Sequence, residues 1–254
     1  MTNEINILFT GYGGNDSDLT PLFDSERVNF INFPTIEIVS TNLTSEEEEK
    51  IRTADNYDYL IFTSANGVRH FIQHYDSDLS NLSKTKVVAI GRKTASLLIN
   101  NNIDVDLIPQ NSSSESIAEL LTENLVREKS ILVPGSMLSK PDLCNSLETK
   151  GAMVDFVAIY DNIIPNNIPR DVEIYVKEGN INLFVFTSPS TFHNFISIFE
   201  IDNIQNYFSD KVIAVIGPVT KEAIEKENLI VRIIPSKYNL DALTEEIINY
   251  YKLN

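Results

Sequence analysis

The chain has 254 residues, 43% of them hydrophobic and 22% charged, so it has room for two modest domains with cores of their own. Its formal net charge of −16 argues against nucleic acid and anionic membranes as partners, because both would repel it. The single cysteine, Cys144, cannot form an internal disulfide, and the sequence contains neither a run of 18 apolar residues nor a secretory signal. We therefore expect a cytoplasmic protein.

The opening of the chain alternates apolar runs with polar breaks. We expect a strand over 5–9, a glycine-rich turn, a helical piece over 19–23, a strand over 28–33 and an extended segment over 36–39. A helix is predicted to begin at Thr44 or Ser45, because Glu47 and Glu48 lie three residues after those positions, as in a capping box.

A stretch of eleven residues then occurs twice, as Phe62–Ile72 and as Phe186–Ile196, with five identical positions. Each copy follows an apolar run and continues with apolar residues at helical spacing, which predicts a strand, a hydroxyl-rich turn and a helix. The first backbone N–H groups of a helix lack intrahelical partners, and the helix dipole adds positive potential there. Such a turn suits an anionic ligand.

The repeat continues downstream of these copies. An apolar run ending in Gly91 is followed by Thr94, and an equivalent run ending in Gly217 is followed by Thr220. A proline lies 18 residues after each of these glycines, at Pro109 and at position 235. Two similar domains are therefore predicted.

A third unit repeats the order of the chain's opening without its identities. It comprises a strand over 131–133, a turn over 134–136, a helix over about 140–150 and a strand over 154–160. The first repeat supplies three strands, near 58–62, 87–91 and 104–108, and this third unit adds two, so one domain has five strands. The second repeat supplies three, near 182–187, 212–217 and 230–234, and the opening of the chain adds two, so the other domain also has five strands.

Alternating strands and helices predict an α/β fold, with two parallel five-stranded sheets that carry helices on both faces. The equal division gives a discontinuous domain of residues 1–35 plus 168–254 and an inserted domain of residues 40–160. Two extended linkers, near 34–39 and 159–167, would join them. Ligands of open α/β sheets lie beyond the carboxyl ends of the strands, so the Ser and Thr turns are expected to face a cleft between the domains.

The ordered set of motifs resembles the uroporphyrinogen-III synthase family from about Asn56 to Leu243. Its members here are Phe62-Thr-Ser-Ala-Asn-Gly-Val, Ile90-Gly-Arg-Lys-Thr-Ala, Val157-Ala-Ile-Tyr160, Phe186-Thr-Ser-Pro-Ser and Ile216-Gly-Pro-Val-Thr. The resemblance implies two flavodoxin-like domains joined by a two-stranded ladder. It also implies a cofactor-free, metal-free lyase of tetrapyrrole and haem biosynthesis, which closes hydroxymethylbilane to uroporphyrinogen III with inversion of the last pyrrole and loss of water.

The resemblance also implies roles for individual residues. Tyr160 matches a tyrosine proposed to assist loss of the hydroxyl, and turn residues match those that hold the carboxylates of the tetrapyrrole substrate, largely through backbone N–H groups. The expected substrate-binding residues are Thr63, Ser64, Asn66, Gly91, Lys93, Thr94, Gly135, Ser136, Ser188, Ser190, Gly217 and Thr220. Arg92 and Lys93 could also meet a carboxylate. The family often has Arg after its first strand and Arg-Gly after the fourth strand of the inserted domain, where this chain has Thr10-Gly and Pro134-Gly.

Other interpretations of the same residues stay open at this stage. Tyr160 could be an amphipathic residue at a strand end, and the turn Ser and Thr residues could be helix caps worth ~1 kcal/mol each. His70 and His74 have the i, i+4 spacing of a metal pair, but no third ligand is evident, so no metal is expected. The competing function is a non-catalytic, two-domain cytosolic protein that binds a small molecule or a tetrapyrrole. In either case we expect a monomer.

Overall fold

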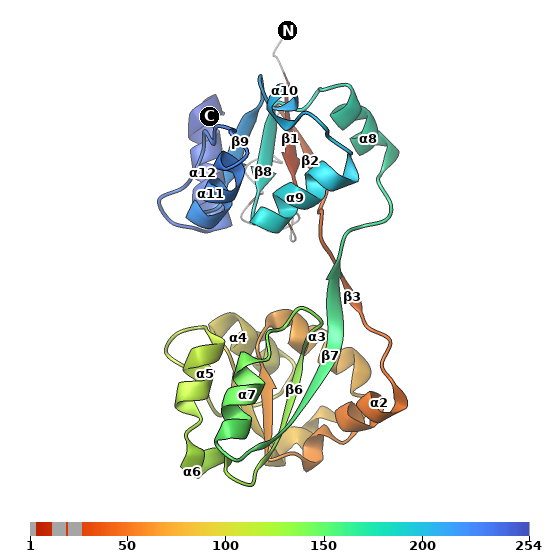
Figure 1. Ribbon diagram of the computed structural model, residues 1–254, viewed down its shortest axis with the longest axis vertical. Helices are drawn as coiled ribbons and strands as arrows, with labels where there is room; N and C mark the ends of the chain where they lie inside the picture. The colour runs from red at the N-terminus through yellow and green to blue at the C-terminus, as the bar shows by residue number, and fades with distance from the viewer. Residues whose placement is uncertain (1–3, 12–18, 20–26, 254) are drawn as a thin grey trace. The chain divides into compact units, whose positions relative to one another are not determined.

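The computed structural model describes residues 4–11, 19 and 27–253. The chain divides into two compact units: unit 1 comprises Met1–Glu37 and Ile163–Asn254, and unit 2 comprises Ile38–Asn162. In Figure 1, unit 1 therefore combines the red beginning and the blue end of the chain. Among the described residues, no helix combines the length and apolar character needed to span a bilayer.

Unit 1 is built on a sheet of order β2-β1-β8-β9, in which all neighbours are parallel. Its elements are β1 (Ile5–Phe9), β2 (Val28–Asn32), α8 (Arg170–Lys177), β8 (Leu183–Phe186), α9 (Pro189–Ile198), α10 (Ile204–Tyr207), β9 (Val212–Val215), α11 (Pro218–Glu225) and α12 (Leu240–Tyr251). Alternate strand residues point to opposite faces. Phe184 and Phe186 pack with α8 and α9, while Leu183 and Val185 pack with α12, so helices cover both faces.

Unit 2 is built on a sheet of order β3-β7-β6-β4-β5. Its elements are β3 (Glu37–Ser40), α2 (Ser45–Arg52), β4 (Tyr59–Phe62), α3 (Ala65–His74), β5 (Lys86–Ala89), α4 (Arg92–Asn100), α5 (Ser114–Leu120), α6 (Glu123–Val126), β6 (Ser130–Ser136), α7 (Asp142–Thr149) and β7 (Met153–Ile163), with short 3₁₀ helices at Ala54–Asn56 and Leu79–Lys84. Leu60 and Phe62 face α2, α3 and α4, and Tyr59 and Ile61 face α5, α6 and α7. The α/β architecture with helices on both faces is thus confirmed.

The internal repeat of the sequence is also a repeat of topology. The order β7-β6-β4-β5 in unit 2 corresponds to β2-β1-β8-β9 in unit 1, with each strand in the place of its repeat partner. The segment from β6 to β7 therefore occupies the same position in the sheet of unit 2 as the segment from β1 to β2 occupies in the sheet of unit 1.

The prediction of five fully paired strands in each unit is wrong in detail. The segments expected at 104–108 and 230–234 make only single bridges, Val88 to Leu107 and Ala214 to Ile233. The physical reason is the same in both units: two successive N–H groups, of Asp106 and Leu107 or of Arg232 and Ile233, donate to one carbonyl, which breaks the even spacing of a parallel ladder. In unit 2 the Asp106 carboxylate also accepts from Val87 N at 2.7 Å.

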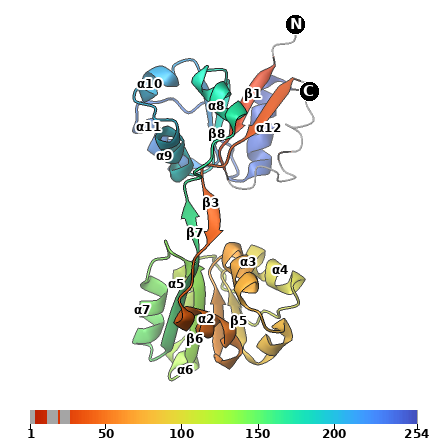
Figure 2. The ribbon, with the colours of Figure 1, turned by 90° about the vertical axis from the view of Figure 1, so that its right-hand side faces the viewer.

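The fifth strand of the unit 2 sheet is instead β3, which the sequence indicated as a linker. It lies beside β7, and Figure 2 shows the two strands running in opposite directions, so this sheet is mixed rather than wholly parallel. The segment Pro134–Ser136, expected to be a turn, continues β6 and pairs with β7 as far as Tyr160. The glycine turn and the helical piece 19–23 lie outside the described residues, apart from Gly11 and Leu19.

Helix α2 begins at Ser45 with the predicted capping box. Glu47 N donates to Thr44 Oγ1 at 3.3 Å, and Thr44 N donates to Glu47 Oε2 at 2.9 Å. The bonds from Thr44 hold the pKa of the Glu47 carboxyl below its usual value. The sequence signal for this helix start is therefore confirmed at the level of single bonds.

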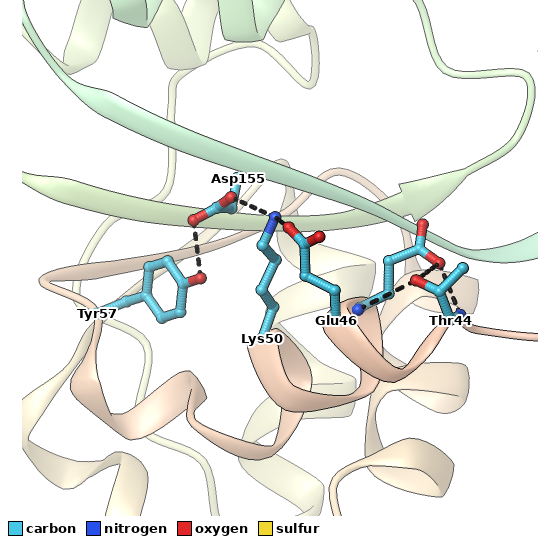
Figure 3. A network of polar contacts seen from close by, with 6 residues as sticks. Thr44, Glu46, Lys50, Tyr57 and Asp155 are labelled. Carbon is cyan, nitrogen blue, oxygen red and sulfur yellow. Dashed lines mark hydrogen bonds and ion pairs between the residues drawn. The ribbon is translucent and has the colours of Figure 1, made fainter.

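A polar network joins the same helix to β7 (Figure 3). Lys50 Nζ lies 2.8 Å from Glu46 Oε1 and 2.9 Å from Asp155 Oδ1, and Tyr57 donates its hydroxyl to Asp155 Oδ2 at 2.9 Å. The two carboxylates, Glu46 foremost, hold the pKa of Lys50 above its usual range, while burial and then Asp155 raise the pKa of Tyr57. The network thus fixes α2 against β7, the strand that carries Tyr160.

Candidate active site

The post-strand serine of unit 2 is both a helix cap and a partner of Tyr160. Ser64 follows β4 in an extended conformation and accepts a hydrogen bond from Gly67 N at 2.8 Å, so it is the N-cap of α3. Its Oγ also lies 2.9 Å from the hydroxyl oxygen of Tyr160. Two of the residues singled out in the sequence, 96 positions apart, therefore meet directly.

Tyr160 is held from several sides near the carboxyl end of β7. Only 7% of its surface is exposed. Its carbonyl accepts from Met137 N at 2.9 Å. Its ring stacks on that of His70, with centroids 5.4 Å apart and planes 18° from parallel. The phenol is therefore fixed in position rather than free to rotate into solvent.

His70 belongs to this cluster, and sequence reasoning did not find that role. Its Nδ1 lies 2.8 Å from Ser40 Oγ, at the end of β3. Burial lowers the pKa of His70, and the neighbouring His74 and Arg69 lower it further, so its ring is neutral at neutral pH. Across residues 4–11, 19 and 27–253, no three His, Cys, Asp or Glu side chains gather as a metal site would require. The i, i+4 spacing of His70 and His74 in the sequence gave no sign that His70 would stack on Tyr160 of β7.

A pocket of about 270 Å³, the Tyr160 pocket, lies beside this tyrosine in unit 2. Thr63 and Tyr160 contribute to its wall together with apolar and polar groups that the sequence did not single out: Val133, Phe156, Ser139 and Lys140. Val133 and Phe156 offer an apolar surface, Lys140 offers a positive charge, and Glu115 and Asp142 bring carboxylates to the same wall. The pocket therefore combines an apolar surface with charged groups of both signs.

The last residues of β6 lie next to this pocket. A Cβ on Gly135 would lie 2.6 Å from the ring of Phe156, so any larger residue would displace that ring. Ser136 is buried, its N–H donates to Ser139 Oγ at 3.1 Å, and its Oγ accepts from Leu138 N at 3.1 Å. Gly135 thus lies against a wall residue of the pocket, whereas Ser136 is engaged in hydrogen bonds with the residues that follow it.

A larger pocket of about 740 Å³, the α4 pocket, surrounds the start of α4. Gly91 is the N-cap without a side-chain bond, and a Cβ there would collide with Ser112 Oγ. Arg92 and Lys93 are exposed in the wall, and neither forms an ion pair among the described residues. Thr94 is buried and also lines the pocket. Free N–H groups and two cations therefore converge on one hollow.

The expected residue Asn66 lies in the first turn of α3. Its side-chain oxygen accepts from Arg69 Nη1 at 2.9 Å. This bond leaves the amide N–H₂ of Asn66 available and keeps an arginine next to the same turn. The pair adds a further positive group near the start of α3.

Unit 1 has the equivalent turns with different chemistry. Ser188 caps α9 by accepting from Thr191 N at 3.2 Å, and Thr191 Oγ1 accepts from Ser188 N at 3.2 Å in return. Ser190 is exposed in the first turn. Gly217 is the N-cap of α11, and Thr220 is buried one turn later. All four expected residues therefore lie at helix starts beyond the carboxyl ends of β8 and β9.

The place where the family often has an arginine is filled by a buried threonine. Thr10 Oγ1 donates to Val185 O at 2.8 Å, so its side chain faces the neighbouring strand. Thr35 lies beside it, with Thr35 N donating to Thr10 O at 3.0 Å. In unit 2 the corresponding place is Pro134, whose carbonyl lies beside Gly67. Neither residue carries a charge toward a ligand.

Comparisons with known proteins agree with this arrangement. A family model described as "Uroporphyrinogen-III synthase HemD" matches residues 17–245. The uroporphyrinogen-III synthase of Synechococcus elongatus is 26% identical over 243 residues, which is 93% of this chain and 92% of the relative.

Solved structures show the same fold. The crystal structure of a mutant uroporphyrinogen III synthase from the extremely thermophilic bacterium Thermus thermophilus matches with a TM-score of 0.65 at 15% identity, over 98% of this chain and 100% of that chain. The synthase of Helicobacter pylori 26695 matches with a TM-score of 0.65 at 17% identity, over 97% of this chain and 99% of that one. Since the family model spans most of the sequence, this chain belongs to the uroporphyrinogen-III synthase family.

Proposed function

We propose that this protein closes the linear tetrapyrrole hydroxymethylbilane to uroporphyrinogen III, with inversion of the terminal pyrrole and loss of water. Membership of the uroporphyrinogen-III synthase family supports the reaction. The observation that carries the mechanism is the Tyr160 hydroxyl, held 2.9 Å from Ser64 Oγ at the edge of a pocket.

In this proposal Tyr160 donates a proton or a hydrogen bond to the departing hydroxyl. A phenol is protonated at neutral pH and can act as a general acid. The electron-rich pyrrole helps to expel the hydroxyl, so the remaining task of the protein is to fold and orient the chain of rings. Fixing Tyr160 between His70 and Ser64 supports such orientation, because a mobile donor would lose most of its advantage.

The substrate carboxylates would be held at the helix starts. In unit 2 these are the turns of Ser64 and of Gly91, where Arg92 and Lys93 add positive charge to the backbone N–H groups. In unit 1 they are the turns of Ser188 and Gly217. The cations stand out in a chain of net charge −16, because they lie where an anion is expected.

Each unit would then be a flavodoxin-like domain. The order β2-β1-β8-β9, completed by the bridge at Ile233, corresponds to the 2-1-3-4-5 order of that fold. In such sheets ligands bind beyond the carboxyl ends of the strands, which is where the candidate residues of both units lie. The expected cleft between the domains, the monomeric state and the cytoplasmic location remain predictions.

The test is turnover of enzymatically generated hydroxymethylbilane, with isomer III scored against the isomer I that forms spontaneously. We expect predominantly isomer III with the protein present. Tyr160→Phe should lower kcat by about 100-fold, the lower end for loss of a general acid, with little change in Tm because the ring remains. A protein that binds the tetrapyrrole without changing the isomer ratio would contradict the proposal.

A further inference from the structure

We infer that Ser64 is a positioning residue for Tyr160: its hydroxyl donates to the phenol oxygen, so that the phenol hydrogen points to the leaving group. This inference rests on the proposed role of Tyr160 as the donor. It assigns to Ser64 a task beyond capping α3 and beyond the backbone contacts of its turn. It also predicts that a Ser64 substitution lowers kcat only while the Tyr160 hydroxyl is present.

The bonding capacity of Ser64 supports this direction. A serine hydroxyl has one hydrogen and two lone pairs. Gly67 N, 2.8 Å away, uses one lone pair and thereby fixes Oγ at the start of α3. The hydrogen remains for Tyr160, whose oxygen lies 2.9 Å away. Ser64 can therefore cap the helix and donate to the phenol at the same time.

The opposite direction would not serve the reaction. If Tyr160 donated to Ser64, its only hydrogen would be used within the protein, and the phenol could offer substrate nothing but lone pairs. Departure of a hydroxyl as water requires a hydrogen from a donor. The state in which Ser64 donates is the one that leaves this hydrogen available.

The proton balance closes with these two residues and the substrate. The C–O bond of the hydroxymethyl group breaks with its electron pair on oxygen, which takes the Tyr160 proton and leaves as water. For the terminal pyrrole to be inverted, that carbon forms a C–C bond with the ring carbon that already carries the methylene bridge. The old bridge bond then breaks, and the bridge carbon bonds to the free α-carbon of the same ring, whose hydrogen leaves as a proton. That proton restores the phenol, and the Ser64 O–H stabilises the phenolate oxygen in between.

The plane of the phenol is fixed separately by His70. The two rings stack at 5.4 Å, and Ser40 Oγ lies 2.8 Å from His70 Nδ1, which holds the imidazole in place. His70 thus limits where the hydroxyl can be, and Ser64 determines how it is oriented. Both constraints come from α3, because Ser64 caps the helix and His70 lies within it.

Unit 1 shows that a cap of this kind needs no tyrosine. Ser188 occupies the same place in the repeat and caps α9 through Thr191 N at 3.2 Å. The strand that corresponds to β7 is β2, which ends at Asn32. Thr35, a short way beyond that end, donates to Thr191 O at 3.0 Å rather than to the serine. The contact with a phenol is therefore an addition to the cap in unit 2.

The test is a double-mutant cycle on kcat and KM for closure of hydroxymethylbilane, with Ser64→Ala, Tyr160→Phe and the double variant. Ser64→Ala should lower kcat about tenfold, the order expected for one lost hydrogen bond to a developing charge. Ser64→Thr, which keeps the hydroxyl, should recover most of kcat. The double variant should have the kcat of Tyr160→Phe alone, because Ser64 acts only through the phenol.

The cap must be separated from the phenol contact. Ser64→Gly removes the hydroxyl while retaining most of the capping preference, so it should lose the same kcat with a smaller fall in Tm. Asn239 caps α12, because its Oδ1 accepts from Ala242 N at 2.9 Å. Asn239→Ala removes this cap and should lower Tm with kcat unchanged. A Ser64→Gly variant with full kcat would show that Ser64 only caps the helix.

The outcomes also separate the two proposals. Full kcat in Tyr160→Phe would overturn the donor role of Tyr160, and the inference on Ser64 with it. Tyr160→Phe could lower kcat, and the double variant could lose a further factor equal to that of Ser64→Ala alone. This result would overturn only the proposed coupling between Ser64 and Tyr160. In that case Ser64 would contribute independently of the tyrosine.

Discussion

The helix starts of the two units descend from one repeat, yet they offer a ligand different groups. In unit 2 the first residues of α3 and α4 are Ala65 and Arg92, which carry backbone N–H groups. In unit 1 the first residues of α9 and α11 are Pro189 and Pro218, which have none. Proline is well suited to begin a helix, so unit 1 has the more rigid helix start and unit 2 the richer set of donors.

The charged groups differ in the same direction. The cations Arg92 and Lys93 of unit 2 correspond, 126 residues later, to Pro218 and Val219 in unit 1. Val219 is 70% exposed, so an apolar side chain stands where unit 2 presents ammonium. Unit 2 thus presents cations at this helix start, and unit 1 presents apolar surface at the equivalent place.

The phenol cluster completes the contrast. His70 of unit 2 corresponds, 124 residues later, to Asn194, whose side chain donates to Thr35 O at 2.9 Å. The same helix position thus holds a tyrosine in one unit and a backbone carbonyl in the other. The repeat supplies a scaffold, and the residues that differ between its copies carry the proposed chemistry. Unit 1 is therefore a built-in reference for experiments on unit 2.

Among the changes that compare the two units, the largest effect is expected when the cations of unit 2 are removed. Arg92→Gln with Lys93→Gln should raise KM about tenfold, since two exposed charge contacts of up to ~1 kcal/mol each add to that order, and kcat should change less. Lys177→Gln with Lys226→Gln in unit 1 is the matched control, because it changes the net charge equally and removes only exposed i, i+4 pairs. Equal increases of KM in both variants would mean that net charge alone governs binding.

An intermediate effect is expected when unit 2 receives the proline of unit 1. Ala65→Pro removes one N–H, and Ser64 before it, at φ −162° and ψ 157°, already has the conformation that precedes proline. Loss of one donor worth ~1 kcal/mol should raise KM about fivefold with Tm nearly unchanged. Ser45→Pro makes the same change at the exposed first residue of α2 and should leave KM alone. An unchanged KM for Ala65→Pro would remove the α3 turn from the site.

The smallest effect concerns pH and stability. Burial lowers the pKa of His70 in the folded protein, so the unfolded chain binds this proton more tightly, and stability should fall as the pH drops below the unfolded value of ~6.5. His70→Asn, which borrows the residue of unit 1, should remove this part of the decline. Tm measured between about pH 7.5 and 5.5 tests it, and parallel curves for the two proteins would contradict it.

The repeat could be predicted from sequence because its signals are local. The Phe-Thr-Ser runs, the Gly-x-x-Thr turns and the capping box at Thr44 each lie within a few residues, and each gave the correct strand end or helix start. These motifs identify positions at the carboxyl ends of strands, which is also where candidate ligand residues gather. Local patterns therefore predicted the scaffold and the helix starts at which the candidate residues lie.

The remainder depends on contacts between distant segments. The bond between Ser64 and Tyr160 and the stacking of His70 follow from the pairing of β6 with β7, which no local pattern encodes. In the same way, the side chain of Asp106 takes a ladder N–H from Val87, and β3 joins the sheet in place of the expected strand. Hydrophobic periodicity identifies an extended segment, but it does not say which neighbour the segment will find.

The insertion of unit 2 into unit 1 has a consequence for the order of synthesis. Strand β1 lies inside its sheet between β2 and β8, but β8 begins only at Leu183, after all of unit 2 has been translated. Domains tend to fold as units as they emerge from the ribosome, so unit 2 can complete its core while β1 and β2 still lack β8. The first strand to be made is then among the last to be buried, because a chain translated only as far as Asn162 still lacks β8 and the helices α8, α9 and α12 that cover Leu8 and Phe9.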